Sequence, residues 1–180
     1  MNIVEGITVG IVLGIDLATS GVKCLVLDEN ARILSVAFQP YPLDTSEPDK
    51  AEQEPEHWWN ATCESIRLAI AQSKRNPGDV KAIGLTGQMH GLVLLDESGT
   101  VIRPAMIWLD SRSSSQCQWV KDTIGEDKVV ELTCNLPLTG FTAPKLLWVR
   151  DNEPENYQRI ETVLLPKDYI RYRMTGEKAT

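Results

Sequence analysis

Short apolar runs separated by turn residues open the chain, and this pattern predicts strands. Residues 13–16 form an apolar run that ends in a carboxylate, and residues 22–27 form a second run that is rich in β-formers. Because the second run alternates poorly, we interpret it as a strand that is buried on both faces. A third run, residues 33–38, follows turn residues at 28–30. Three short strands joined by tight turns predict an antiparallel meander.

Polar and helical patterns follow the meander. Residues 40–55 are polar and contain several prolines and acidic residues, so we expect an exposed loop there. Pro55 suits the first turn of a helix. Its predicted apolar face, at helical spacing, is Trp59, Cys63, Ile66 and Ile70. A short branched strand is expected at residues 80–85. The order strand, helix, strand favours a mixed or parallel sheet with helices packed on it.

The second half of the chain predicts a hairpin, two helices, a strand and a final helix. The hairpin joins residues 92–95 to residues 101–108 around a turn at residues 96–99. The first helix would bury Cys117, Val120 and Ile124 and end at Gly125. The second would start with Thr142 as its cap and bury Leu146, Leu147 and Val149. The strand is expected at residues 163–166, and the final helix at residues 168–174, closed by Gly176.

Composition changes this picture only by excluding some functions. The chain has 180 residues, 42% of them hydrophobic and 24% charged, which is ordinary for a globular protein. The formal net charge of −7 argues against nucleic acid or an anionic membrane as a general partner. The four cysteines are scattered without a Cys-x-x-Cys pair, which fits a reducing cytoplasm. Residues 1–10 are interpreted as an N-terminal extension rather than a signal sequence.

The first candidate site is the turn after the first strand. Asp16 ends that strand, and the small and hydroxyl residues Thr19, Ser20 and Gly21 form the turn. Backbone N–H groups in such a turn can cradle phosphate oxygens. A neighbouring carboxylate can hold Mg²⁺, which takes only one or two protein ligands, and Lys23 would add positive charge. The alternative is an ordinary hairpin, because Asp, Ser and Gly also favour turns for local reasons.

The second candidate site is the glycine-flanked loop at residues 86–91. His90 is one of two histidines, and its two ring nitrogens suit hydroxyl recognition. Gln88 offers a donor and an acceptor, and Met89 can pack against the apolar face of a sugar. A turn histidine without a role is the alternative. Asp110, after Trp108, is either a sugar ligand or the cap of the following helix.

These motifs together resemble a known family. Gly-Ile-Asp-x-x-Thr-Ser-x-x-x-Lys, from residue 14 onward, resembles the first phosphate motif of the sugar-kinase, Hsp70 and actin superfamily, although those kinases usually have Gly where this chain has Ala18. Residues 140–152 fit the first signature of the FGGY family of carbohydrate kinases. Gly-Gln-Met-His-Gly at residues 87–91 and Trp-x-Asp-x-Arg at residues 108–112 extend the resemblance.

The resemblance implies a fold and an activity. The fold would be an α/β, ribonuclease-H-like (actin-like ATPase) domain, with a mixed central sheet, an opening meander and flanking helices. The reaction would be transfer of the ATP γ-phosphoryl group to the terminal hydroxyl of a ketopentose, D-xylulose. Asp16 would orient Mg²⁺ through water, and Thr19, Ser20, Gly21 and Lys23 would approach the phosphates. Gln88, Met89, His90 and Asp110 would form the sugar site.

The resemblance also implies parts that residues 11–180 do not contain. Family members carry a catalytic aspartate, the general base, and an adenine-binding second domain farther along. We therefore expect an incomplete N-terminal domain without a C-terminal domain, and no turnover by these residues alone. Alternatives are another FGGY kinase acting on ribulose, fuculose or gluconate, a non-catalytic actin-like nucleotide-binding module, or a purely structural piece. Homodimerisation of the full-length protein stays open.

Overall fold

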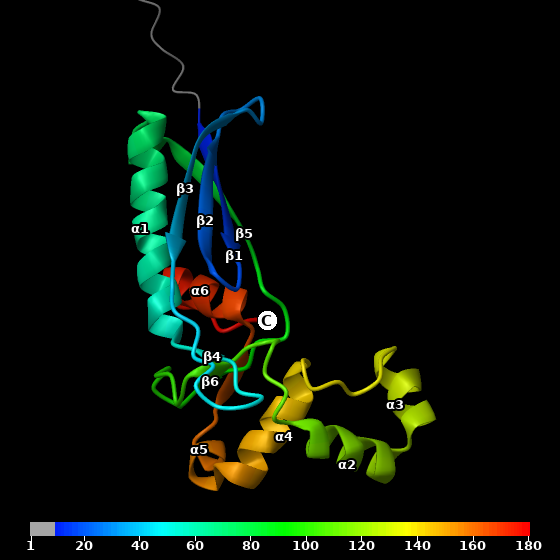
Figure 1. Cartoon of the computed structure of the whole chain (residues 1–180). Coiled ribbons are helices and arrows are strands. Elements are labelled where there is room, and N and C mark those ends of the chain that lie inside the picture. Colours follow the sequence, from blue (N-terminus) through cyan, green and yellow to red (C-terminus); the bar gives the residue numbers. More distant parts are fainter. Residues whose placement is uncertain (1–9) are drawn as a thin grey trace, which may run out of the picture. The chain divides into compact units, whose positions relative to one another are not determined.

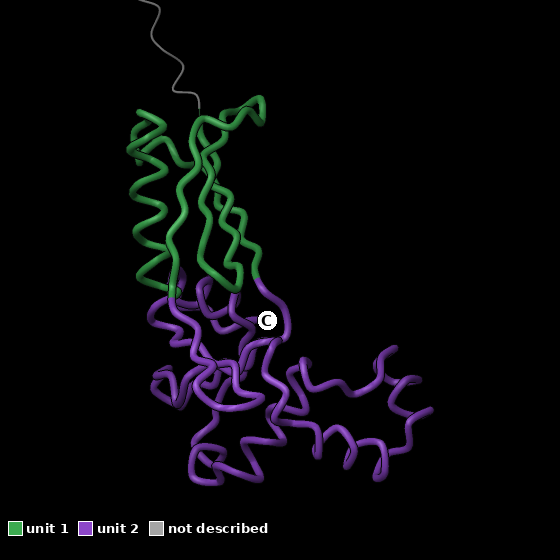
Figure 2. Tube along the Cα trace, in the orientation of Figure 1, with its two compact units in different colours: residues 1–41, 58–87 green, residues 42–57, 88–180 purple. Residues whose placement is uncertain are grey.

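The protein is described by a computed structural model that covers residues 10–180. The expected extension at residues 1–10 therefore lies, apart from its last residue, outside the described residues. The chain divides into two compact units, shown in Figure 2. Unit 1 comprises residues 10–41 and 58–87, and unit 2 comprises residues 42–57 and 88–180. Among the described helices, none is both long and apolar enough to cross a bilayer.

Unit 1 is built on a four-stranded mixed sheet with the strand order β3-β2-β1-β5. The first three strands run antiparallel to their neighbours, which confirms the predicted meander. The fourth strand, β5, lies parallel to β1 and follows the crossover helix α1. The strands are β1 (Ile11–Leu17), β2 (Gly21–Leu27), β3 (Ile33–Pro40) and β5 (Val80–Gly87), and a 3-10 turn, η1 (Pro77–Asp79), precedes β5.

The burial of β2 corrects the prediction that this strand is covered on both faces. Val22, Cys24 and Val26 are fully buried, whereas Lys23 between them is exposed. The strand therefore alternates, with one face in the core and one face open. The sequence hid this alternation because Leu25, on the open face, is also apolar.

Helix α1 (Pro55–Ser73) belongs to unit 1 from Trp58 onward and lies along one side of the sheet in Figure 1. The expected buried face is wrong by one position, because Trp59, Cys63, Ile66 and Ile70 are only partly buried. The buried side chains are Trp58, Ala61, Thr62, Ser65 and Ala69. Small side chains on this face let the helix backbone approach the sheet. The Ser35 hydroxyl donates a hydrogen bond of 2.6 Å to the carbonyl oxygen of Ala69.

Unit 2 has two short antiparallel strand pairs beside a small apolar core. Strand β4 (Glu52–Gln53) pairs with β7 (Ala105–Met106), and β6 (Val93–Leu95) pairs with β8 (Thr162–Leu164). The core consists of Leu92, Leu94, Met106 and Val149. The predicted hairpin is therefore only partly correct, since β6 finds its main partner in β8. The expected exposed loop is also wrong at residues 51–53, which are buried.

The helices of unit 2 are α2 (Ser114–Ile124), α3 (Glu126–Thr133), α4 (Thr142–Asn152), α5 (Pro154–Gln158) and α6 (Pro166–Thr175). Gly125 and Gly176, at φ +89° and +79°, end α2 and α6 as predicted. The predicted cap at Thr142 is wrong, because Phe141 is the N-cap and no side chain caps the helix. Ile124 is 46% exposed rather than buried. The sequence analysis did not predict α3 or α5.

Candidate functional site

The candidate phosphate turn lies in unit 1, between β1 and β2. Asp16 pairs with Lys23 across the antiparallel ladder and with Thr86 across the parallel one. All three side chains are exposed on the open face of the sheet. Gly14 and Gly84 are neighbours in the same register, two pairs before Asp16 and Thr86 and therefore on the same face of the sheet. Because two glycines meet there, the sheet face beside Asp16 carries a hollow of about 390 Å³.

The turn itself is fixed by Tyr41, which is buried. Its hydroxyl donates a hydrogen bond to the carbonyl oxygen of Ala18, and the Ala18 N–H donates to the carbonyl oxygen of Gly21 at 3.1 Å. Burial, with a contribution from the Asp16 carboxylate, raises the pKa of Tyr41 above its ordinary value. Ala18 has no positive φ, so a residue with a Cβ fits there without strain. Gly21 is required for space, because a Cβ would come within 2.5 Å of the Gln39 carbonyl oxygen.

The donor set around Asp16 fits Mg²⁺ better than a transition metal. No group of three or more His, Cys, Asp or Glu side chains suited to a metal occurs within residues 10–180. Asp16 instead stands as one exposed carboxylate near the hydroxyl residues of the turn. Mg²⁺ keeps most of its waters and binds proteins through one or two carboxylates plus substrate phosphates. The single exposed carboxylate of Asp16 would therefore be the protein ligand of such an ion.

The second candidate site is the loop at residues 88–91 of unit 2, which we call the imidazole loop. The Gln88 side chain is buried, and its Nε2 donates a hydrogen bond of 2.9 Å to Oε1 of Gln53. Met89 is 68% exposed. His90 has φ +61°, in the left-handed region that non-glycine residues seldom occupy. Gly91 lies against the ring of Pro166, where an added Cβ would come within 2.4 Å. Gln88 and Gly91 thus anchor the loop on either side of Met89 and His90.

The His90 ring lies on the ring of Phe141, with centroids 4.4 Å apart. Lys145 of α4 lies beneath this pair, with a fully buried side chain. Its Nζ donates hydrogen bonds to the carbonyl oxygens of His90, at 3.0 Å, and Gly140, at 2.6 Å. Burial lowers the pKa of Lys145 to about 8, although Asp110 acts in the opposite sense. Burial and the charge of Lys145 lower the pKa of His90, which favours the neutral imidazole. A neutral ring offers one donor and one acceptor to a hydroxyl.

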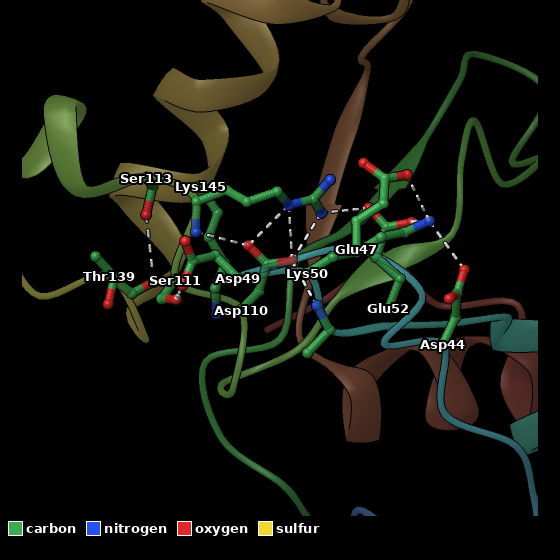
Figure 3. A network of polar contacts seen from close by, with 12 residues as sticks. Asp44, Glu47, Asp49, Lys50, Glu52, Asp110, Ser111, Ser113, Thr139 and Lys145 are labelled. Atoms are coloured by element: carbon green, nitrogen blue, oxygen red, sulfur yellow. Dashed lines mark hydrogen bonds and ion pairs between the residues drawn. The ribbon is translucent and has the colours of Figure 1, made fainter.

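Asp110 is the centre of a buried polar network, which is drawn in Figure 3. Its carboxylate has no exposure and accepts hydrogen bonds from the Ala51 N–H, at 2.9 Å, and from Nη2 of Arg112, at 2.7 Å. The same Arg112 guanidinium reaches Glu52, and it lies 4.4 Å from the ring centre of Trp148. Both oxygens of Asp110 accept hydrogen bonds from protein donors, and the bond from Ala51 connects Asp110 to the residue before β4. A direct contact of Asp110 with the sugar stays a prediction.

The predicted site residues thus fall into two groups, one in each unit. Asp16, Thr19, Ser20, Gly21 and Lys23 lie in unit 1, and Gln88, Met89, His90 and Asp110 lie in unit 2.

The sequence analysis gave no role to three residues that shape the imidazole loop. Phe141 and Lys145 entered only within residues 140–152, as part of the resemblance to the family signature, and Gln53 fell within the expected loop. The one available signal was Lys145 itself, which directly precedes the apolar residues of the helix. A lysine at such a position is buried only when its amine has partners, so its place in the sequence indicated a structural role.

Comparisons with known proteins identify the family of this chain. Residues 11–180 match the N-terminal domain of the FGGY family of carbohydrate kinases. The chain belongs to the FGGY family. It is 44% identical over 168 residues to a xylulose kinase of Escherichia coli K12, and 41% identical over 165 residues to one of Bacillus subtilis. These alignments cover 93% and 92% of this chain but 34% and 33% of the relatives. The FGGY chain therefore spans about a third of the length of the curated relatives it matches.

Solved structures support the same FGGY fold. A xyloylose kinase from Brucella ovis superposes with a TM-score of 0.87 at 39% identity, over 93% of this chain and 34% of that one. A xylulose kinase from Rhodospirillum rubrum superposes with a TM-score of 0.88 at 26% identity, over 94% of this chain and 35% of that one. The mixed sheet with flanking helices is thus the actin-like fold of sugar kinases, as predicted from the sequence motifs.

Proposed function

We propose that this domain serves an ATP-dependent sugar kinase that transfers the γ-phosphoryl group to the terminal hydroxyl of a ketopentose, D-xylulose. The observation that carries the proposal is the anchored imidazole loop. It presents an exposed Met89 beside a neutral imidazole whose backbone conformation is fixed. Identity of 44% to a relative described as a xylulose kinase supports the choice of sugar.

The imidazole loop provides the two contacts that a small polyol needs. A sugar has apolar C–H faces and hydroxyl edges, so it takes both packing contacts and hydrogen bonds. The thioether of Met89 offers the packing surface, and the ring nitrogens of His90 offer a donor and an acceptor. Gln88 orients the loop through Gln53, and Asp110 holds β4, which carries Gln53.

The turn at residues 18–21 provides the phosphate side of the proposal. In this hairpin, which Tyr41 holds at the Ala18 carbonyl oxygen, the hydroxyl residues Thr19 and Ser20 lie between β1 and β2, and Lys23 adds a positive charge. Asp16 would hold Mg²⁺ through water, and the ion when bound would neutralise charge on the phosphates. Phosphoryl transfer depends mainly on positioning and charge neutralisation, so two rigid groups of this kind suit it.

The test is a substrate profile of the protein at its full natural length. ADP release is followed in a coupled assay with D-xylulose, D-ribulose, L-fuculose, D-gluconate and glycerol, each with and without Mg²⁺. The proposal expects Mg²⁺-dependent turnover with kcat/KM highest for D-xylulose. A higher kcat/KM for another sugar would show that this sugar, and not D-xylulose, is the substrate. Nucleotide binding without turnover of any sugar would favour a non-catalytic nucleotide-binding module.

A further inference from the structure

We propose that Lys145 is a positioning residue that sets the imidazole loop for the sugar. The inference rests on the proposed function, because it assigns the residue that holds the proposed sugar contacts in place. Lys145 does not itself face the site: its side chain is fully buried, and its amine is directed at two backbone carbonyl oxygens.

The two carbonyl oxygens come from two separate segments. One belongs to His90, in the imidazole loop, and the other belongs to Gly140, at the start of α4. The residue after Gly140 is Phe141, whose ring lies on the His90 ring. One ammonium group therefore bonds the backbone at His90 and at the residue before Phe141, whose ring contacts the His90 ring at a tilt of 34°. Hydrogen bonds from a charged donor are stronger than bonds between neutral groups.

The backbone of His90 needs such a support. At φ +61° it occupies a region in which a Cβ crowds the backbone, and residues stay there only when their surroundings hold them. The other anchors of the loop act on its neighbours: Gln88 is held by Gln53, and Gly91 packs on Pro166. Lys145 acts on the His90 backbone itself, because its Nζ donates a hydrogen bond of 3.0 Å to the His90 carbonyl oxygen.

The site is built for a lysine. A fully buried amine loses hydration, and its two hydrogen bonds and the Asp110 carboxylate offset only part of this loss, since the pKa of Lys145 stays lowered to about 8. Gly140 leaves little room, since an added Cβ would come within 3.0 Å of the Trp108 carbonyl oxygen. A guanidinium is larger and planar, so it does not reproduce a compact amine between two carbonyl groups. A charge is thus placed where packing alone would favour an apolar residue.

The first test uses the wild-type protein and needs no sugar. Nuclear magnetic resonance of ¹⁵N-lysine-labelled protein detects ammonium protons only where exchange with water is slow. The proposal expects a protected Lys145 signal, with magnetisation transfer to the amide proton of Phe141. Lys128, on the exposed surface of α3, serves as the control and gives no protected signal. A rapidly exchanging Lys145 amine would overturn the proposal.

The second test replaces the amine. Lys145→Met removes both hydrogen bonds and keeps the chain length, Lys145→Gln keeps two N–H donors, and Lys128→Met is the surface control. In Lys145→Met the His90 ring signals should lose the shift caused by Phe141, while those of the exposed His57 stay unchanged. Lys145→Gln should retain part of that shift. If both variants keep the wild-type His90 signals, Lys145 does not position the loop. If Lys145→Met fails to fold, the comparison rests on Lys145→Gln and the wild-type measurement.

Kinetics then connect the loop to the sugar. In the protein at full natural length, Lys145→Met should raise the KM for D-xylulose on the order of 10- to 100-fold, because small misplacements of a binding group have effects of this size. The KM for ATP should change less than about twofold, whereas a general loss of structure would change both. Absence of wild-type turnover on any ketopentose would refute the proposed function, and the resonance tests would still decide the role of Lys145.

Discussion

The Asp110→Asn substitution tests whether Asp110 acts by holding the backbone of unit 2. The carboxylate accepts one bond from the Ala51 N–H and bonds from Nε and Nη2 of Arg112, at 2.9, 3.0 and 2.7 Å. These three bonds all reach Oδ2, and Oδ1 accepts from the Arg112 backbone N–H and Nε, both at 3.2 Å. An asparagine has one carbonyl oxygen, so its NH₂ group would face the donors of one of these two positions. The guanidinium would also lose one of its two carboxylate partners, although Glu52 would remain.

The expected effect follows from this geometry. Removing one partner of a buried ion pair costs about 3–5 kcal/mol. Because Glu52 still compensates the charge of Arg112, we expect a loss at the lower end, about 3 kcal/mol. The loss should be local, because the partners of Asp110 all lie in unit 2.

Hydrogen exchange measured by mass spectrometry resolves this effect by segment. Peptides from residues 42–57 should lose about 3 kcal/mol of protection, and peptides covering β2 in unit 1 should keep theirs. Asp122→Asn, an exposed carboxylate on α2, is the matched control and should change protection by less than about 0.5 kcal/mol. A loss below about 1 kcal/mol at residues 42–57 would refute the holding role and return Asp110 to the sugar site.

Three further predictions follow from the structure. Tyr41→Phe leaves the partly buried Ala18 carbonyl oxygen without its donor, so it should lower the free energy of unfolding by about 0.5–1.5 kcal/mol. It should raise the KM for ATP but not the KM for sugar, and an equal rise in both would contradict the role of Tyr41 at the turn. Lys145 has an ordinary pKa of 10.5 and a folded pKa of about 8, so the unfolded chain binds the extra proton between these values. The free energy of unfolding of the wild type, minus that of Lys145→Met, should therefore rise by about 3 kcal/mol between pH 8 and 10.5. Urea denaturation across this pH range measures the difference, and a difference that does not change with pH would contradict the burial of a charged amine. Residues 1–180 alone should release no ADP with D-xylulose in the coupled assay, and clear turnover would show that they suffice for catalysis.

The strands and turns of unit 1 were predictable because their sequence signals are local. The carboxylate near the end of β1 and the turn at residues 28–30 each act on their own segment, and in unit 2 the glycines after α2 and α6 do the same. The buried face of α1 was not predictable in the same way. Thr62, Ser65 and Ala69 are small or polar, and they are buried because the helix approaches the sheet closely, which is a property of tertiary packing.

The candidate site shows the same division. Residues 88–90 were predictable because glycines and polar side chains between two apolar runs indicate an exposed functional loop. The hydrogen bond from Lys145 that supports this loop was not predictable, because Lys145 is 55 residues away from His90 in the sequence. The role of Asp110 was predicted only in part, since its spacing to Arg112 is visible in the sequence, whereas its bond to Ala51 joins residues 59 positions apart.

The most direct test of the account is the pair of Michaelis constants of His90→Ala in the protein at full natural length. The imidazole loop is assigned to the sugar and the turn at residues 18–21 to the nucleotide. The account therefore predicts that the KM for D-xylulose rises at least about 10-fold, because losing a hydrogen bond that leaves a polar group unpaired has an effect of this size. It predicts that the KM for ATP does not change. An unchanged KM for D-xylulose, or a rise confined to ATP, would contradict it.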